Sequence, residues 1–346
     1  MQDLPHQYIH ISLSPWDLSD DYNRHTGTTI ASVLENCSRK VIIHLLYEEI
    51  FSQQNPEGAE ANIQKYQQLA SEYGAEVVFH AVTLPEWVND SDRKNLQHFT
   101  PGTLLRLYLP TLLSDDISKI IYLDCDIVVK TDLAKLWDVP LEDYSLAACI
   151  DAANKSNVRF YSDVHKPFGI DWEKYFNAGF LVMNLEKIRE TRALPDIVMD
   201  IIYQHPELPY LDQDVLNIVF QNDMYFLSQR YNLPVGMRMT DYRLMKKLGI
   251  REGEYGDCIL HFNGRKKPWK VYSGVVDEEY WQYFKKTPWC EDEMMFSGYY
   301  NVAREGKVGF VDWVMSQRFN LCVRTIHSIS VYLIRLLIYS SRMILR

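Results

Sequence analysis

The sequence predicts an α/β fold with a Rossmann-like, mostly parallel central sheet flanked by helices. Two observations support this prediction. Between residues 8 and 130, short apolar segments alternate with longer segments whose apolar residues recur at helical spacing. The short segments are apolar along their whole length, which is typical of strands that helices bury on both faces. In sheets of this kind, ligands bind at the carboxyl ends of the strands.

The expected elements of this region follow one another along the chain. In the first predicted helix, Ile30, Val33 and Leu34 share one face, and in the second Ile63 and Tyr66 do so. We expect strands at Tyr8–Leu13, Val41–Leu46 and Ala75–Val82, and helices at Thr26–Cys37 and Ala59–Tyr73. Beyond residue 150 the pattern loosens into long polar and aromatic stretches, which are typical of functional loops.

The composition limits the function classes. The chain has 346 residues, of which 47% are hydrophobic, so a substantial core is expected; its formal net charge is −10. This acidic balance argues against nucleic acid as a partner of the whole surface. None of the 15 glycines forms a GxGxxG or GxxxxGK(S/T) fingerprint. An NAD-type Rossmann domain and a P-loop NTPase are therefore disfavoured.

The sequence also predicts the compartment. The six cysteines lie far apart without a CxxC pair, which fits a reduced cytosolic chain. The N-terminus has no basic start followed by an apolar stretch. No segment reaches the roughly 18 uninterrupted apolar residues that a bilayer span requires. We therefore expect a cytoplasmic protein without a transmembrane helix.

Two carboxylates interrupt an apolar run. The segment Lys119–Val129 places Asp124 and Asp126 inside what otherwise reads as a buried strand. In an extended chain these two side chains would project to the same side. Two negative charges so close in an apolar setting would repel strongly unless a cation held them, so we expect a divalent metal. Asp-x-Asp also occurs at Asp90/Asp92 and Asp212/Asp214, so the apolar setting, not the triplet, carries this prediction.

The segment Asp257–Trp269 supplies a third ligand. A short apolar strand leads into His261, and an imidazole beside two carboxylates suits Mn²⁺ better than the all-oxygen shell that Mg²⁺ prefers; Mg²⁺ is the alternative metal. Gly264 would let the backbone approach a phosphate, and Lys267 would neutralise it. A hydrogen-bonded core histidine and a solvated turn are the alternative interpretations. In combination, these residues favour a metal–diphosphate site.

Five sequence blocks resemble a known family. They lie in order between residues 8 and 270, and such a set is far more specific than any single motif. The blocks are Arg106–Pro110, Tyr122–Asp126, Phe176–Gly179 with Met183–Leu185, Leu211–Asp214 with Asn217, and His261–Trp269. They resemble glycosyltransferase family 8, the retaining, metal-dependent sugar transferases of the glycogenin and lipopolysaccharide galactosyltransferase type. The resemblance implies a GT-A fold, which we assign to residues 1–290.

The resemblance also implies a UDP-sugar donor and roles for single residues. Mn²⁺ would be held by Asp124, Asp126 and His261, and the diphosphate would contact Gly264 and Lys267. The other donor-binding positions that it implies are Arg106, Cys125, Asp151, Asn177, Ala178, Gly179, Asp212 and Gln213. Short amide and carboxylate side chains suit sugar hydroxyls because they donate or accept in fixed directions. The alternatives are a helix N-cap for Asp212 and a turn residue for Asn177.

One segment departs from the family pattern. After the first strand the family normally has a short run that ends in an acid contacting the uracil, whereas Ser14–Tyr22 is longer. Asp17, Asp20 and Asp21 compete for this role. We favour Asp20 or Asp21, followed by Tyr22, because they lie closest to the next predicted helix.

The implied activity is the retaining transfer of a hexose from a UDP-sugar to an acceptor hydroxyl. The donor would be UDP-glucose or UDP-galactose, and the acceptor a saccharide, a glycoprotein or a lipid-linked glycan. Gln213, Asp212 and Lys267 are the expected catalytic residues. Because an amide is a poor nucleophile, Gln213 favours front-face attack over a covalent intermediate.

Other interpretations of the same residues stay open. Trp269, Trp281 and Trp289 could stack on acceptor sugars or pack a C-terminal subdomain. A non-catalytic UDP-binding protein at a membrane surface is one alternative function. A phosphohydrolase of the haloacid dehalogenase type is another, because Asp124–Val129 also fits its nucleophile motif, although no downstream acidic metal motif follows.

Residues 291–346 are predicted to form a helical C-terminal extension. Between residues 313 and 346 there are five arginines and no acid, and on a helix most of them fall on one face. Such a basic amphipathic helix would lie on an anionic membrane surface. It contributes +5 to the net charge of −10, which leaves −15 on the remainder. We expect attachment to the inner face of the cell membrane; a helix packed on the acidic body is the alternative.

Overall fold

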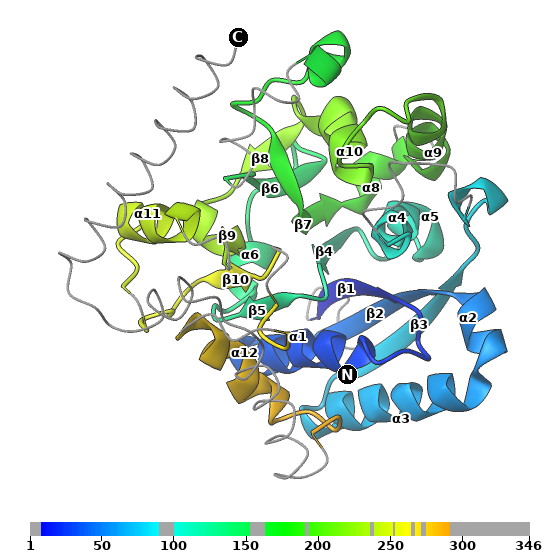
Figure 1. Ribbon diagram of the computed structural model, residues 1–346, viewed down its shortest axis with the longest axis vertical. Helices are drawn as coiled ribbons and strands as arrows, with labels where there is room; N and C mark the ends of the chain where they lie inside the picture. The colour runs from blue at the N-terminus through cyan, green and yellow to red at the C-terminus, as the bar shows by residue number, and fades with distance from the viewer. Residues whose placement is uncertain are drawn as a thin grey trace, which may run out of the picture.

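The chain folds around a seven-stranded mixed sheet in the computed structural model (Figure 1). The structure describes residues 8–89, 100–152, 163–190, 194–235, 239–251, 253–263, 267–270 and 275–290. In spatial order, the strands of the sheet are β3 (Glu76–Val82), β2 (Val41–Glu48), β1 (Ile9–Trp16), β4 (Lys119–Leu123), β7 (Phe176–Asn184), β6 (Leu146–Ile150) and β8 (Met224–Phe226).

Most neighbouring strands of this sheet run parallel. β1 pairs in parallel with β2 and β4, β2 with β3, and β6 with β8. β7 is antiparallel to both of its neighbours, β4 and β6. The predicted α/β class, the mostly parallel sheet and the first three strands are confirmed, with strand ends shifted by a few residues.

Helices cover both faces of the sheet, and the residues of β4 alternate between two cores. Ile121 and Leu123 join the core beneath α1 and α3, whereas Ile120 and Tyr122 join the core beneath α4 and α8–α10 (Figure 1). The helices are α1 (Asn23–Asn36), α2 (Glu49–Gln54), α3 (Pro56–Glu72), α4 (Gly102–Leu105), α5 (Leu109–Leu112), α6 (Ala134–Trp137), α8 (Leu185–Glu190), α9 (Leu194–Gln204), α10 (Asp212–Phe220), α11 (Met239–Lys247) and α12 (Val276–Phe284). Burial on both faces explains why the strands are apolar throughout.

A second, three-stranded sheet adjoins the carboxyl end of β4. It consists of β5 (Ile127–Val129), β10 (Ile259–His261) and β9 (Leu233–Pro234) in that spatial order. Asp124, Cys125 and Asp126 form the turn between β4 and β5, so the expectation of one continuous strand is wrong. The chain leaves β7 after Leu123 and next pairs with β10, where His261 lies opposite Ile127. This register places His261 beside the aspartate turn.

A row of three histidines crosses the first half of the large sheet. His10 on β1, His44 on β2 and His80 on β3 are hydrogen-bonded in sequence, with nitrogen–nitrogen distances of 2.9 Å on both sides of His44. Burial, followed by the neighbouring His10 and His80, lowers the pKa of His44 to about 3. Burial also lowers the pKa of His10 and of His80. The row is therefore uncharged at neutral pH.

The C-terminal prediction falls outside the described residues. The expected amphipathic helix at 313–346 and the domain boundary at 290 remain predictions, because the description of the structure ends at residue 290. Within the described ranges, no helix has the length and apolar character needed to span a membrane.

Candidate active site

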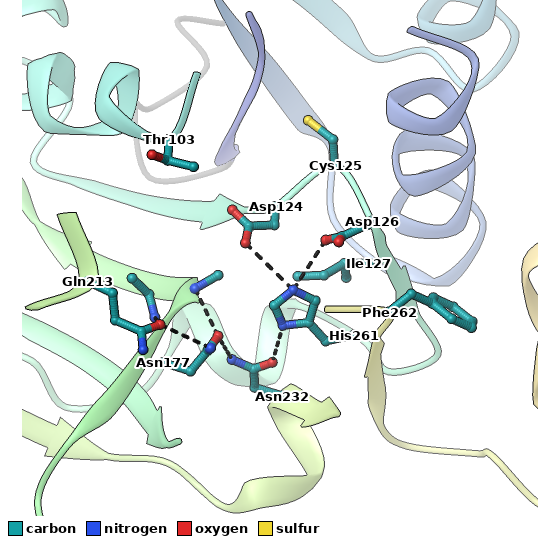
Figure 2. A network of polar contacts seen from close by, with 12 residues as sticks. Thr103, Asp124, Cys125, Asp126, Ile127, Asn177, Gln213, Asn232, His261 and Phe262 are labelled. Atoms are coloured by element: carbon teal, nitrogen blue, oxygen red, sulfur yellow. Dashed lines mark hydrogen bonds and ion pairs between the residues drawn. The ribbon is translucent and has the colours of Figure 1, made fainter. Parts of the chain in front are cut away.

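Two carboxylates and one imidazole converge at the junction of the two sheets (Figure 2). Asp124 and Asp126 come from the turn after β4, and His261 ends β10. His261 Nε2 lies 3.6 Å from Asp124 Oδ2 and 3.2 Å from Asp126 Oδ1. One ligand atom from each residue lies within 4.8 Å of the others, and the described part of the chain holds no other such group. The three residues predicted as metal ligands are therefore brought together.

In each of these three residues, one polar atom contacts a neighbouring residue and another faces the other two members of the group. Asp124 Oδ1 lies 3.0 Å from Arg106 Nη2, and His261 Nδ1 lies 2.8 Å from Asn232 Oδ1. Asp126 Oδ1 is buried, and no hydrogen bond to it is found among the described residues. Two carboxylate oxygens and one imidazole nitrogen are thus turned toward one point, and this donor set fits a divalent cation such as Mn²⁺.

A lysine stands next to this group. The Lys267 ammonium donates to Asp126 Oδ2 and to the carbonyl oxygen of Phe262, at 2.5 and 2.6 Å. Burial opposes ionisation of Asp126, but Lys267 and His261 together hold the pKa of Asp126 well below its ordinary value. Asp126 is therefore ionised at neutral pH, and a cation is available beside it for an anionic ligand.

Gly179 on β7 permits the close approach of the metal group to the sheet. A Cβ atom at this position would lie 2.3 Å from His261 Cε1, 2.5 Å from Asp124 Oδ2 and 3.1 Å from Asn177 Oδ1. The first two separations are shorter than real carbon contacts allow. Asp124 is also tied to this strand, since its N–H donates to the Gly179 carbonyl at 2.8 Å. Only glycine fits here without moving a predicted metal ligand.

Arg106 connects the metal group to the start of α10. This buried guanidinium lies 3.0 Å from Asp124 and 3.3 Å from Asp212, and it also donates to the carbonyl of Ala178. Its plane packs over the Tyr122 ring at 4.2 Å. Burial raises the pKa of Asp212 to about 6, an effect that Arg106 partly offsets. The arginine thus holds two carboxylates that would otherwise repel each other.

A wall of amides lies on the other side of Arg106. The Gln213 carboxamide accepts from Ala178 N–H at 3.0 Å and from Asn177 Nδ2 at 3.1 Å. Its Nε2 donates to Asp151 Oδ2 at 2.9 Å and to Tyr175 Oη at 3.2 Å. Four of the predicted sugar-binding residues, Asp151, Asn177, Ala178 and Gln213, are therefore joined in one hydrogen-bonded network, whose amide and carboxylate groups are of the types that suit sugar hydroxyls.

The residues after β1 differ in their placement. Asp20 accepts hydrogen bonds from Tyr22 N–H and from Asn23, and burial raises the pKa of Asp20 to about 6. The Asp21 side chain is 92% exposed and pairs with Arg24 at the surface. Burial and then the nearby Asp126 raise the pKa of Tyr22, which places Tyr22 next to the metal group. Of the two favoured acids, Asp20 is the one turned toward the protein.

The aromatic residues near the site are mostly core residues. Trp281 and Trp289 are 2% and 6% exposed, so packing, and not sugar stacking, is their role. Trp269 stacks on His25 with ring centroids 3.8 Å apart, and His25 Nδ1 lies 2.7 Å from the Tyr280 hydroxyl. This stack anchors the chain two residues beyond Lys267.

Three predicted positions need correction or lie outside the description. The Cys125 thiol is buried in the apolar core, away from the two aspartates (Figure 2), so its side chain does not face the site. Asp212 is not an N-cap; Leu211 occupies that position with a φ of 45°, a left-handed conformation that costs a leucine on the order of 1–3 kcal/mol. Gly264 lies outside the described residues.

Sequence reasoning missed four residues that hold the site together. Tyr122 donates to Asp124 Oδ1 at 3.0 Å, and Tyr175 donates to buried Asp214 at 2.7 Å. Tyr122 and Asp214 stand inside the quoted sequence blocks, so a rule that also considered the neighbours of each motif would have found them. Asn232, which contacts His261, has no sequence signal, because it lies next to β10 only through the pairing of β9.

Comparison with known proteins places the chain in a family. The profile described as "Glycosyl transferase family 8" matches residues 15–272. General stress protein A of Bacillus subtilis is 27% identical over 280 residues, covering 78% of this chain and 92% of that protein. The lipopolysaccharide 1,3-galactosyltransferase of Salmonella typhimurium is 24% identical over 273 residues, covering 76% of this chain and 74% of that protein.

Solved structures agree at the level of the fold. The structure of the galactosyltransferase LgtC in complex with donor and acceptor sugar analogues aligns with a TM-score of 0.62 and 22% identity. The alignment covers 81% of this chain and 96% of that one. LgtC and this chain therefore share the GT-A fold that was expected. Because the family profile spans most of the folded region, the chain belongs to glycosyltransferase family 8 and is a glycosyltransferase.

Proposed function

We propose that this enzyme transfers glucose or galactose from a UDP-sugar to a hydroxyl of a saccharide, glycoprotein or lipid-linked glycan, with retention and with Mn²⁺. One observation carries the proposal: Arg106 joins the Asp124 carboxylate of the metal group to Asp212 at the edge of the amide wall. In this proposal the metal-bound diphosphate and the sugar would bind side by side. A UDP-sugar needs that arrangement, and a phosphohydrolase does not.

The residues present fit a divalent metal, which Asp124, Asp126 and His261 would hold through their unpaired atoms. When bound, such a metal stabilises the charge that develops on the departing diphosphate. Lys267 would neutralise the same group. Tyr22 and Asp20 would lie toward the nucleoside. Gln213, Asn177 and Asp151 would orient the sugar hydroxyls by exchanging hydrogen bonds within their own network for hydrogen bonds to the sugar.

The proposed transfer is a front-face reaction. The bond between the anomeric carbon and the UDP oxygen breaks, a bond to the acceptor oxygen forms, and the acceptor proton passes to the departing phosphate oxygen. Gln213 is an amide whose donors and acceptors are all engaged, and the Asp212 carboxylate is paired with Arg106. Neither is a free nucleophile. Mass-spectrometric trapping of a covalent hexose on either residue would contradict this course.

The name of one relative bears on the donor and the acceptor. The Salmonella relative is named a lipopolysaccharide 1,3-galactosyltransferase, which supports UDP-galactose and a lipid-linked glycan for this chain. The test measures UDP release from a panel of UDP-sugars with and without Mn²⁺. We expect one hexose donor to dominate and chelation to abolish release. Equal release without metal would contradict the metal requirement, and release only from non-hexose donors would contradict the donor class.

The same proposal places the enzyme at the inner face of the cell membrane through residues 313–346. Its support is the five arginines of this segment, without an acid among them. Sedimentation of the full-length protein with anionic vesicles tests it, beside a variant in which Arg324, Arg335 and Arg342 are all replaced by glutamine. We expect the variant to stay in the supernatant. Equal sedimentation of both proteins would contradict membrane binding by this segment.

A further inference from the structure

The directions of the hydrogen bonds around His261 follow from contacts with backbone groups, because a backbone N–H can only donate and a backbone carbonyl can only accept. On β7, the N–H of Gly179 donates to Asn177 Oδ1 at 3.0 Å, and the N–H of Ala178 donates to Gln213 Oε1 at 3.0 Å. A peptide N–H can only donate. The atoms that these two groups contact must therefore be the oxygens of the side-chain amides, which fixes the orientation of Asn177 and Gln213.

The orientation of Asn232 follows from that of Asn177. Asn232 lies 2.8 Å from Asn177 Oδ1, and since that atom is an acceptor, Asn232 must present its NH₂ group to it. The Asn232 oxygen is then directed at His261 Nδ1, 2.8 Å away (Figure 2). Because an amide oxygen accepts only, Nδ1 of His261 must carry a proton. In the neutral imidazole the lone pair for a ligand is then on Nε2, the atom between the two carboxylates.

Asn232 is itself well held. Its side chain is 2% exposed, and it lies at the end of a short 3₁₀ turn just before β9, the strand that pairs with β10. Its backbone carbonyl accepts from Gln229 Nε2 at 2.8 Å. A buried amide so placed has little freedom to flip. The Asn232 amide accepts from the imidazole through its oxygen and donates to a second amide through its nitrogen.

We propose that Asn232 is a positioning residue that holds His261 as the Nδ1–H tautomer, with Nε2 directed at the metal, and that links this ligand to the sugar-facing amide of Asn177. The roles of His261 as a metal ligand and of Asn177 as a sugar contact rest on the proposed function. The tautomer of His261 does not depend on that function. Substitution of a residue that orients a metal-ligating histidine typically weakens metal binding by about 10–100-fold.

Two variants separate the two contacts of Asn232. Asn232→Ala removes both, so we expect the Kd for Mn²⁺ to rise by about 10–100-fold. Asn232→Asp still accepts from His261 Nδ1 but cannot donate to Asn177. We expect this variant to keep near-native Mn²⁺ affinity and to bind the UDP-sugar about tenfold more weakly, because the new carboxylate and Asn177 Oδ1 would face each other as two acceptors without a proton between them. Asn222→Asp, on the exposed side of the protein, is the matched control.

The tautomer is measured directly by long-range ¹⁵N–¹H correlation of the metal-free protein, at a pH at which the imidazole is neutral. The His261 signals are assigned by their absence in His261→Gln. We expect protonated Nδ1 in the unsubstituted protein and in Asn232→Asp, and a mixture of tautomers in Asn232→Ala. Calorimetric titration with Mn²⁺, and then with UDP-sugar, supplies the two affinities without any turnover.

Each result decides one part of the proposal. Protonated Nε2 in the unsubstituted protein, or unchanged Mn²⁺ affinity in Asn232→Ala, would overturn the assignment of Asn232 to His261. Unchanged UDP-sugar affinity in Asn232→Asp would overturn the link to Asn177. If the unsubstituted protein binds no UDP-sugar, the proposed function fails, while the tautomer measurement still tests Asn232. If Asn232→Ala does not fold, the Asn232→Asp variant and the tautomer of the unsubstituted protein carry the test.

Discussion

Two regions of this protein gather polar side chains, and they do so in different ways. The candidate site gathers two ion pairs, Asp124 with Arg106 and Asp126 with Lys267. The histidine row on β1–β3 gathers imidazoles that burial keeps neutral, each sharing a hydrogen bond with the next. Of these two regions, the one that holds carboxylates and cations is the one where a charged ligand is expected to bind.

The difference has a thermodynamic reason. Burying a charged group costs several kcal/mol of desolvation free energy, even when the group is ion-paired. A buried charge that binds no ligand therefore adds no stability to the fold. A buried neutral imidazole with partners on both nitrogens has no such cost at neutral pH. Substitutions in the site should therefore change activity with small effects on stability, and changes in the row should affect stability and its pH dependence with small effects on activity.

The largest effect is expected from Asp126→Asn. This substitution removes one anionic ligand from the metal group and leaves Lys267 without its carboxylate partner. We expect UDP release to fall by about 10³-fold, corresponding to about 4 kcal/mol of transition-state stabilisation. Asp116→Asn, at an exposed position, is the control and should retain full activity. A loss of less than about tenfold would show that the metal group is not the catalytic centre.

Gly179→Ala should come next. Its Cβ atom would press on His261 and Asp124, and displacement of reacting or ligating groups by about 1 Å costs about 10²-fold in rate. Metal affinity, measured by Mn²⁺ titration, should fall together with activity. Gly27→Ala is the matched control, because its Cβ would lie 2.4 Å from the Trp289 ring in the core. That variant should lower the melting temperature and leave Mn²⁺ affinity unchanged; the reverse pattern would contradict this account.

Tyr175→Phe tests the support of the amide wall. The Tyr175 hydroxyl donates to Asp214 and accepts from Gln213 Nε2, so its loss frees one side of the Gln213 amide. We expect kcat to fall by about tenfold, or about 1.4 kcal/mol, with little change in KM for the donor. Tyr144→Phe, at a position that is 37% exposed, is the control. An increase in KM at constant kcat would mean that Tyr175 serves binding alone.

An effect no larger than that of Tyr175→Phe is expected in the histidine row, and it appears in the pH dependence of stability. Because the pKa of His44 is lowered to about 3 from 6.5, the folded state takes up its proton less readily than the unfolded chain. The stability that His44 contributes is therefore complete above pH 6.5 and declines as the pH falls. At about pH 5.5 the loss is about 1.4 kcal/mol of the free energy of unfolding.

Urea unfolding at two pH values measures this loss. His44→Gln, which is neutral at both, should show a fall in unfolding free energy between about pH 7.5 and pH 5.5 that is smaller by about 1.4 kcal/mol than in the unsubstituted protein. His205→Gln, at an exposed position, is the control. Equal falls in all three proteins would mean that the row takes up protons freely.

Local patterns in the sequence were sufficient for the fold class and for the first half of the large sheet. The apolar segments that became β1, β2 and β3 and the helical spacing of α1 and α3 were recognisable because residues three or four apart, or continuous runs, report which faces are buried. The family blocks added the chemical identity of the site. The meeting of Asp124, Asp126 and His261 was expected on the same grounds.

The tertiary structure alone decided how these groups are held. The aspartate turn joins two sheets and does not lie within one strand, and this depends on which strands pair with β4 and β5. The bridge from Asp124 through Arg106 to Asp212, and the contact of Asn232 with His261, join residues far apart in the chain. Periodicity reports burial, but the partners of a buried polar atom depend on strand register, which sequence patterns do not contain.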